Sequence, residues 1–203
     1  MRDWWLRTLL VLQRPRPVFV ALRDTSSESV SERAEPVLAI VLLAGIALVL
    51  QTTTAAHLLD SNDYDAVLVA IWAFLAGSLY GGVGYWIAGA FLYWGCRLLG
   101  SQGDFRRARH VLAFAVVPIA LSLLLWPVKL ALYGEDVFRS GGSDTGAGAH
   151  VFTALELACD LWAVALLVIG VRSVHGWTWS RALAACLLGV GVPVLLGIAL
   201  SYA

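Results

Sequence analysis

Charged residues are scarce in this chain. Only 14% of its 203 residues are charged, 14 Lys and Arg balance 14 Asp and Glu, and the formal net charge is zero. A soluble domain has about a quarter of its residues charged. Here 60% of the residues are hydrophobic and the mean hydropathy is +0.78. We therefore expect an integral membrane protein, and no nucleic-acid partner.

Cysteine is also scarce. Cys96, Cys159 and Cys186 fall inside apolar stretches, and no C-x-x-C pair is present. Three such cysteines exclude a disulfide framework and fit buried free thiols. His57, His150 and Glu156 are conceivable zinc or manganese ligands, but their spacing matches no metal motif. We expect neither a metal nor another cofactor.

Catalytic signatures are missing as well. The chain has no H-E-x-x-H, no G-x-S-x-G, no phosphate-binding loop and no second intramembrane Asp for an aspartyl dyad. We therefore expect a protein that is not an enzyme.

Long apolar runs are what the sequence does have. They predict an all-α integral membrane protein of five transmembrane helices preceded by an N-terminal interfacial amphipathic helix. Residues 1 to 35 would form the cytoplasmic interfacial helix and a polar connector, with Pro36 in the first turn of the first span. Residues 36 to 203 would form the membrane domain, with spans at about residues 36 to 56, 66 to 99, 111 to 133, 150 to 172 and 182 to 202.

The second span is too long for a straight crossing. At 1.5 Å per residue, residues 66 to 99 would extend about 50 Å against a hydrocarbon core of about 30 Å. We favour one long helix bent at its glycines over a re-entrant pair. The spacing of Gly77 and Gly81 permits close approach of another helix. The residues expected to shape helix packing are Gly77, Gly81, Gly82, Gly84, Pro118, Pro127 and Pro193.

The arginines are distributed unevenly between alternate connections. The N-terminal region and the second and fourth connections carry twelve Lys and Arg, whereas the other connections carry two. By the positive-inside rule, the N-terminus is expected in the cytoplasm and the C-terminus outside the cell (inner) membrane. The cytoplasmic basic face would bind anionic lipid head groups or an acidic partner, or simply hold its loop inside, through Arg97, Arg106, Arg107, Arg109 and His110.

The fourth span contains two carboxylates, Glu156 and Asp160, one helical turn apart. A charge inside a membrane normally faces protein and finds a partner. Counted from the connecting loop, Lys129 lies at the depth of Glu156, and we expect an ion pair between them. The expected hydrogen-bonding residues at the level of Asp160 are Ser78, Tyr80 and Ser122. This polar cluster is either a static packing device or an ion or proton pathway.

Three segments resemble the Yip (Ypt/Rab-interacting protein) domain family in its bacterial form: RPRPVFVALR, GSQGDFRRARHVLAFAVVP and DLWAVALLVIGVRSVHGWTWSRA. The resemblance runs from about Arg14 to Gly197, and it matches the D-x-W of the family to Asp160 and Trp162. It implies a membrane-embedded adaptor. Eukaryotic relatives bind Rab-type GTPases, but their D-L-Y-G-P motif is absent here, and residues 112 to 114 replace a Gly-Tyr pair, so Rab binding is not expected.

Two classes of function remain open. The first is a non-enzymatic scaffold or adaptor with a trafficking-like or transporter-accessory role. Its partners would be the lipid bilayer, a protein in the membrane or at its cytoplasmic face, or a second copy of the chain. The second is a small transporter or channel for an ion, proton or lipid, using the face of Glu156 and Asp160.

Overall fold

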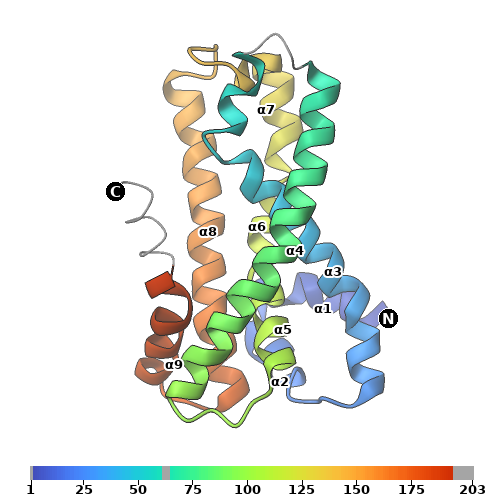
Figure 1. The fold of residues 1–203 in the computed structure, drawn as a ribbon, viewed down its shortest axis with the longest axis vertical. Helices are drawn as coiled ribbons and strands as arrows, with labels where there is room; N and C mark the ends of the chain where they lie inside the picture. The colour runs from blue at the N-terminus through green and yellow to red at the C-terminus, as the bar shows by residue number, and fades with distance from the viewer. Residues whose placement is uncertain (1, 61–64, 194–203) are drawn as a thin grey trace.

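The fold is a bundle of long helices. A computed structural model describes residues 2–60 and 65–193, which contain no strand. In Figure 1 the long helices run along the vertical axis of the molecule, and two short N-terminal helices lie in its lower half. In chain order the α-helices are α1 Arg2–Gln13, α2 Pro15–Ala21, α3 Ser27–Leu50, α4 Ala66–Leu98, α5 Phe105–Ala115, α6 Val117–Ser122, α7 Leu125–Tyr133, α8 Gly146–His175 and α9 Trp179–Cys186.

Four helical stretches are long and apolar enough to cross a membrane: Ser27–Leu50, Ala66–Leu98, Phe105–Phe138 and Gly146–His175. A shorter apolar stretch, Trp179–Gly191, follows them. The predicted fifth span, residues 182 to 202, extends beyond Pro193 and so lies partly outside the described residues. The count of five spans therefore stays a prediction, and the chain is a multi-pass membrane protein.

Helix α3 begins earlier than expected because the sequence before the apolar run caps it. The Ser26 hydroxyl accepts a hydrogen bond from the Ser29 amide at 3.4 Å, which satisfies a first-turn N–H group. The polar connector is therefore the first part of α3. Pro36 lies inside the helix, and the expectation that it occupies the first turn is wrong.

The third membrane segment is a broken helix. It comprises α5, α6, α7 and the 3-10 turn η2 (Gly134–Phe138), and the breaks fall just before Pro118 and Pro127. Proline has no N–H to donate and its ring clashes with the preceding turn. Near the second break, the Leu124 amide donates to the Leu121 carbonyl at 3.0 Å. The two residues are three positions apart, as in the narrower 3-10 helix, rather than four as in an α-helix.

Helices α3 and α4 cross at a contact between glycines. A Cβ atom added to Gly45 would lie 2.5 Å from the Gly81 Cα, and one added to Gly77 would lie 2.5 Å from the Ile46 Cα. Side chains there would separate the two backbones. By contrast, Gly82 and Gly84 do not take part in helix packing as expected, because no described atom lies within 4 Å of a Cβ added at either position.

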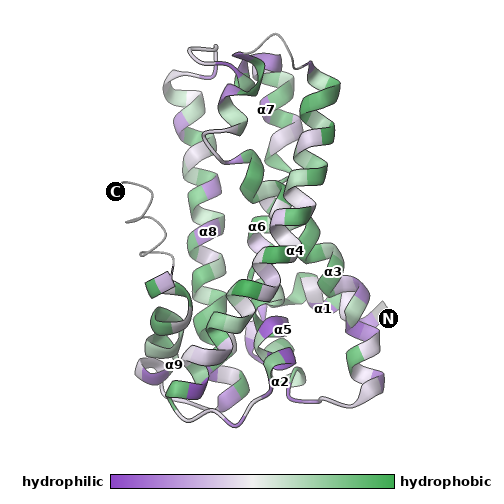
Figure 2. Cartoon of the chain, in the orientation of Figure 1, coloured by the Kyte–Doolittle hydropathy of each residue, from purple (hydrophilic) through white to green (hydrophobic). Residues whose placement is uncertain are grey.

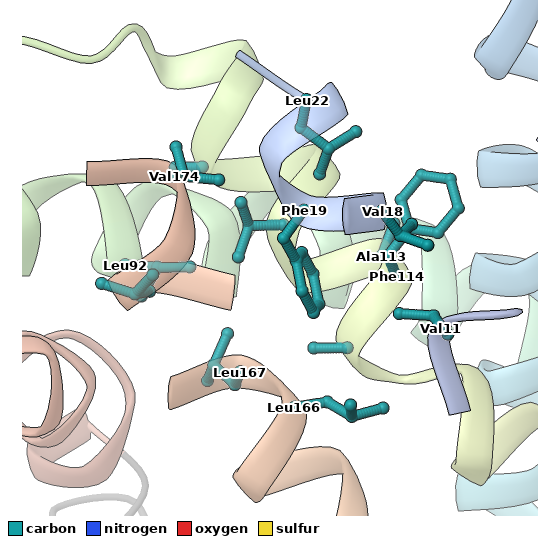
Figure 3. Close-up of a cluster of buried hydrophobic side chains, with 14 of the residues drawn as sticks. Val11, Val18, Phe19, Leu22, Leu92, Ala113, Phe114, Leu166, Leu167 and Val174 are labelled. Atoms are coloured by element: carbon teal, nitrogen blue, oxygen red, sulfur yellow. The ribbon is translucent and has the colours of Figure 1, made fainter. Parts of the chain in front are cut away.

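The main hydrophobic core lies in the half of the bundle that receives the N-terminus. Figure 3 shows Val11, Phe19 and Leu22 of the N-terminal segment beside Phe114 and Leu166 of the long helices, and all five are fully buried. The N-terminal segment is thus two helices anchored in the bundle. The opposite face of α1 exposes Leu6 and Leu9, as expected of a helix that also contacts lipid.

Helix α4 is one continuous helix, and Figure 1 shows its two halves running in different directions. Its lower half contacts α9 and the π-helical turn η3 (Leu187–Gly191). A Cβ atom added to Gly95 would lie 2.7 Å from the Gly189 amide nitrogen. Small residues therefore set the close contacts of α4 with α3 and with η3.

Candidate functional site

Figure 2, which colours the chain by hydropathy, shows hydrophilic residues concentrated toward the two ends of the bundle. We call one end the arginine-rich end; it comprises α2, the turn at residues 99–104, the start of α5, the end of α8 and the start of α9. The other, the acidic end, comprises the 3-10 helix η1 (Ala55–Asp60), η2 and the connection to α8. A smaller polar group lies between them, inside the membrane-spanning region.

That inner polar group is centred on Lys129 of α7 and Glu156 of α8. Lys129 Nζ donates a hydrogen bond to Glu156 Oε1 at 3.1 Å. The two side chains are only 14% and 11% exposed. The equal depths expected from the sequence thus correspond to a direct contact, and the pair removes an unpaired charge from the membrane interior.

An aromatic ring completes the surroundings of this ammonium group. Lys129 Nζ lies 4.4 Å from the centre of the Trp126 ring, which itself stacks on Phe138. Lys129 is the only lysine in the chain. Trp126 was not predicted as a site residue, although its position three residues before Lys129 places both on one helix face.

Asp160 is not joined to this pair. Its Oδ1 is buried and has no hydrogen-bond partner among residues 2–60 and 65–193. Ser122 donates instead to the Ile119 carbonyl at 2.7 Å, the Ser78 hydroxyl is buried without a described partner, and Tyr80 is exposed. The structure therefore brings together Lys129 and Glu156 but not the other residues of the expected cluster.

At the arginine-rich end, several guanidinium groups bind backbone carbonyls near helix C-termini. Arg23 donates to the Val174 carbonyl at 3.0 Å and to the Ser173 carbonyl at 2.5 Å, both in the last turn of α8. Arg181 donates to the Leu99 carbonyl at the end of α4. The final carbonyls of a helix lack intrahelical donors and carry partial negative charge, so these cations satisfy them.

The five residues of the predicted basic face have different roles in the structure. Arg107 donates to the Arg23 carbonyl at 3.3 Å, and the Arg109 guanidinium lies 3.6 Å from the centre of the Trp86 ring. His110 is buried, while Arg97 and Arg106 are exposed. The expected continuous basic face is therefore partly used for internal contacts.

A small arginine pocket also lies at this end, with a volume of about 200 Å³. Arg16, Arg23 and Arg172 line it, together with Gly176 and Trp177. Arg172 Nε has no described hydrogen-bond partner. Sequence reasoning did not identify this pocket, because its arginines come from separate elements that only the fold brings together.

At the acidic end, Ser140 joins His57 and Asp60. The Ser140 amide donates to Asp60 Oδ1 at 2.7 Å, its hydroxyl donates to Asp60 Oδ2, and His57 Nδ1 lies 2.6 Å from the same hydroxyl oxygen. Because the single hydroxyl hydrogen goes to Asp60, His57 Nδ1 donates to Ser140. A serine nucleophile needs a histidine that accepts its proton, so this arrangement does not activate Ser140.

Two donors at the acidic end stabilise a carboxylate. The Ser140 hydroxyl and amide, followed by His57, lower the pKa of Asp60 below its ordinary value. Within the described residues, no group of three or more His, Cys, Asp and Glu side chains is placed to hold a metal. The hydrogen bonds of Ser140 with His57 and Asp60 thus hold η1 against the segment that follows η2.

Comparison with known proteins identifies one family. The model of the Yip1 domain matches residues 9–201, which is nearly the whole chain. No curated protein and no solved structure matches the chain.

Proposed function

This chain belongs to the Yip1 domain family, and we propose that it is a non-enzymatic scaffold or adaptor embedded in the cell (inner) membrane. In this role the helical bundle fixes the protein in the bilayer, and its arginine-rich end presents a docking surface to a partner protein. The role would be trafficking-like or accessory to a transporter. A second copy of the chain is a further candidate partner within the membrane.

The observation that carries this proposal is the closed Lys129 to Glu156 pair. For this pair to carry a proton or an ion, water or the solute would have to reach it. Here each partner is satisfied by the other at 3.1 Å, and both side chains are shielded from solvent. The pair therefore supports a fixed contact between α7 and α8 more than a moving charge.

The arginine pocket supports docking of an acidic group. Arg16, Arg23 and Arg172 converge on it, and guanidinium groups bind carboxylates in a planar two-pronged geometry. Because the positive-inside rule places arginine-rich connections in the cytoplasm, this pocket would face a cytoplasmic partner, and the acidic end would face outward.

Site-specific photo-crosslinking in intact membranes tests the proposal. A photoreactive residue at Val20, which is exposed and lines the pocket, is expected to give one discrete adduct. Arg16→Glu should abolish the adduct by reversing the local charge, whereas Arg139→Glu at the acidic end should leave it intact. The absence of an adduct, or one indifferent to Arg16→Glu, would contradict the proposed docking.

Transport of a proton or small ion is the second candidate, and Asp160 favours it. Its Oδ1 is buried without a described partner, as for a group that binds a solute transiently. Flux into liposomes containing wild-type protein would decide this. Flux above the level of empty liposomes, reduced by Asp160→Asn, supports transport. Flux equal to that of empty liposomes would contradict the proposal of transport.

A further inference from the structure

A groove with one basic wall lies between α3, α4 and α5. Its volume is about 290 Å³. Val37 and Leu38 of α3 form its apolar side, while Arg106, Arg109 and His110 of α5 form its basic side. The groove is thus amphipathic, and it lies toward the arginine-rich end.

Two residues of the basic wall have buried nitrogen atoms without partners. His110 is 6% exposed, and its Nδ1 has no hydrogen-bond partner in the described chain; the same is true of Arg109 Nε. Arg33, Arg106 and Arg109 lie close enough to His110 to act on it electrostatically, together with one carboxylate, Asp104. Three guanidinium groups and one carboxylate leave an excess of positive charge, which favours the binding of an anion.

An apolar crevice continues from the groove toward the middle of the bundle. Its volume is about 190 Å³, and it shares Val41 and Tyr85 with the groove. Along α3 the crevice extends from Val41 to Leu48, about 10 Å at the helical rise per residue. One leaflet of a bilayer has a hydrocarbon depth of about 15 Å, so the crevice matches much of one acyl chain.

We propose that the groove and crevice together bind one anionic phospholipid. Its phosphate contacts Arg106, Arg109 and His110, and one acyl chain lies in the crevice beside Val41 and Leu48. The positive wall selects an anion, and the apolar continuation selects a ligand with a hydrocarbon chain. An apolar transmembrane helix of a partner fits less well, because it would bring no negative charge to Arg106 and Arg109 of the basic wall.

Two variants test the site by different means. Gly82 lines the groove, and a Cβ added there meets no described atom within 4 Å, so the backbone has room for the side chain of Gly82→Leu, which would occupy part of the groove. It should abolish binding of phosphatidylglycerol, measured by native mass spectrometry in a neutral detergent. Arg106→Gln removes one charge-assisted contact from an exposed position and should weaken binding about tenfold.

Matched controls separate the groove from the rest of the surface. Ala70→Leu places the same side chain at an exposed position of α4 outside the groove, and Arg97→Gln removes an exposed arginine near the same end. Both should bind phosphatidylglycerol like the wild type, and phosphatidylcholine should bind at least tenfold more weakly. Equal affinity for the two lipids, or full binding by Gly82→Leu, would overturn the proposal.

Two other occupants are distinguished by further measurements. Inorganic phosphate should not compete with phosphatidylglycerol at equal concentration. Effective competition would show that the site recognises phosphate alone and would overturn the lipid assignment. The oligomeric state of Gly82→Leu in detergent should equal that of the wild type. A change from oligomer to monomer would instead identify the groove as a protein interface.

Discussion

At the arginine-rich end, guanidinium groups bind backbone carbonyls and aromatic rings. In the acidic half of the molecule, by which we mean the acidic end together with the inner polar group of Lys129 and Glu156, side chains bind one another. Arg23 and Arg181 illustrate the first arrangement, since both donate to carbonyls near helix ends. The Lys129 to Glu156 pair and the hydrogen bond from the Ser140 hydroxyl to Asp60 illustrate the second.

The two arrangements differ in whether a substitution can remove the partner of a charged group. A carbonyl belongs to the backbone, so no substitution removes it, and the helix that carries it keeps its partial negative charge. A side-chain partner is removed by one substitution, which leaves the other charge behind. The acidic half should therefore be more sensitive to single changes, and the arginine-rich end should tolerate changes in everything except its cations.

The largest effect is expected at the inner pair. Glu156→Gln leaves the Lys129 ammonium in an apolar setting and should lower the free energy of unfolding by about 3 kcal/mol. Replacing both, as Lys129→Met with Glu156→Leu, should restore most of the loss because no charge remains. Unfolding by steric trapping in bicelles measures both.

The pair of Glu135 and Arg139 provides the control for this experiment. These groups are 3.8 Å apart and exposed, so Glu135→Gln should cost less than about 0.5 kcal/mol. A Glu156→Gln protein as stable as the wild type would show that the Lys129 to Glu156 pair does not contribute to the free energy of unfolding. It would also contradict the proposed difference between the two halves.

A smaller effect is expected from Arg23. Arg23→Gln removes two charged hydrogen bonds to the end of α8 and should cost about 1 to 2 kcal/mol, since the side chain is partly open to solvent. Arg23→Lys should recover only part of this, because one ammonium cannot reproduce the fork geometry. Arg97→Gln is the matched control, and a loss as large there would contradict the role assigned to Arg23.

The contact of Arg109 with Trp86 should contribute less to the stability of the protein than the hydrogen bonds of Arg23. A double-mutant cycle with Arg109→Gln and Trp86→Leu is expected to give a coupling energy of about 0.5 to 1 kcal/mol. Arg109→Lys should retain part of it through its charge. Strictly additive effects of the two substitutions would show that the short distance between guanidinium and ring has no energetic consequence.

The smallest effect concerns pH and Asp60. Because the pKa of Asp60 is lowered in the folded protein, its contribution to stability is present above the ordinary carboxyl pKa and is lost as the pH falls through the lowered value. Ser140→Ala removes the hydroxyl donor and should raise the pKa of Asp60, measured by NMR titration. An unchanged pKa would show that the hydroxyl does not stabilise the carboxylate.

Some of this structure follows from local sequence and some depends on how helices are rotated. The equal depth of Lys129 and Glu156 follows from their distances to one loop, and the breaks before Pro118 and Pro127 follow from the chemistry of proline. The glycine that α3 contributes to its crossing with α4, Gly45, was not predicted, because rotation about the axis of α3 decides which small residue faces the partner.

The arginine-rich end was the least predictable part. Charge counting showed that Arg107 and Arg109 belong to a basic segment, but it could not show that one binds a carbonyl of another segment and the other an aromatic ring of α4. Likewise, the sequence did not predict that α3 extends through the polar connector, where Ser26 caps the helix start and the Arg33 guanidinium lies 5.5 Å from the centre of the Trp4 ring.

Lys129 is the only lysine in the chain, so every other basic side chain except histidine is an arginine. A guanidinium group keeps its proton at any pH that a cell encounters. The positive charge of the arginine-rich end therefore does not depend on the acidity of the compartment that it faces. A direction of insertion set by these arginines would stay the same in an alkaline compartment, which a set of lysines near their pKa would not guarantee.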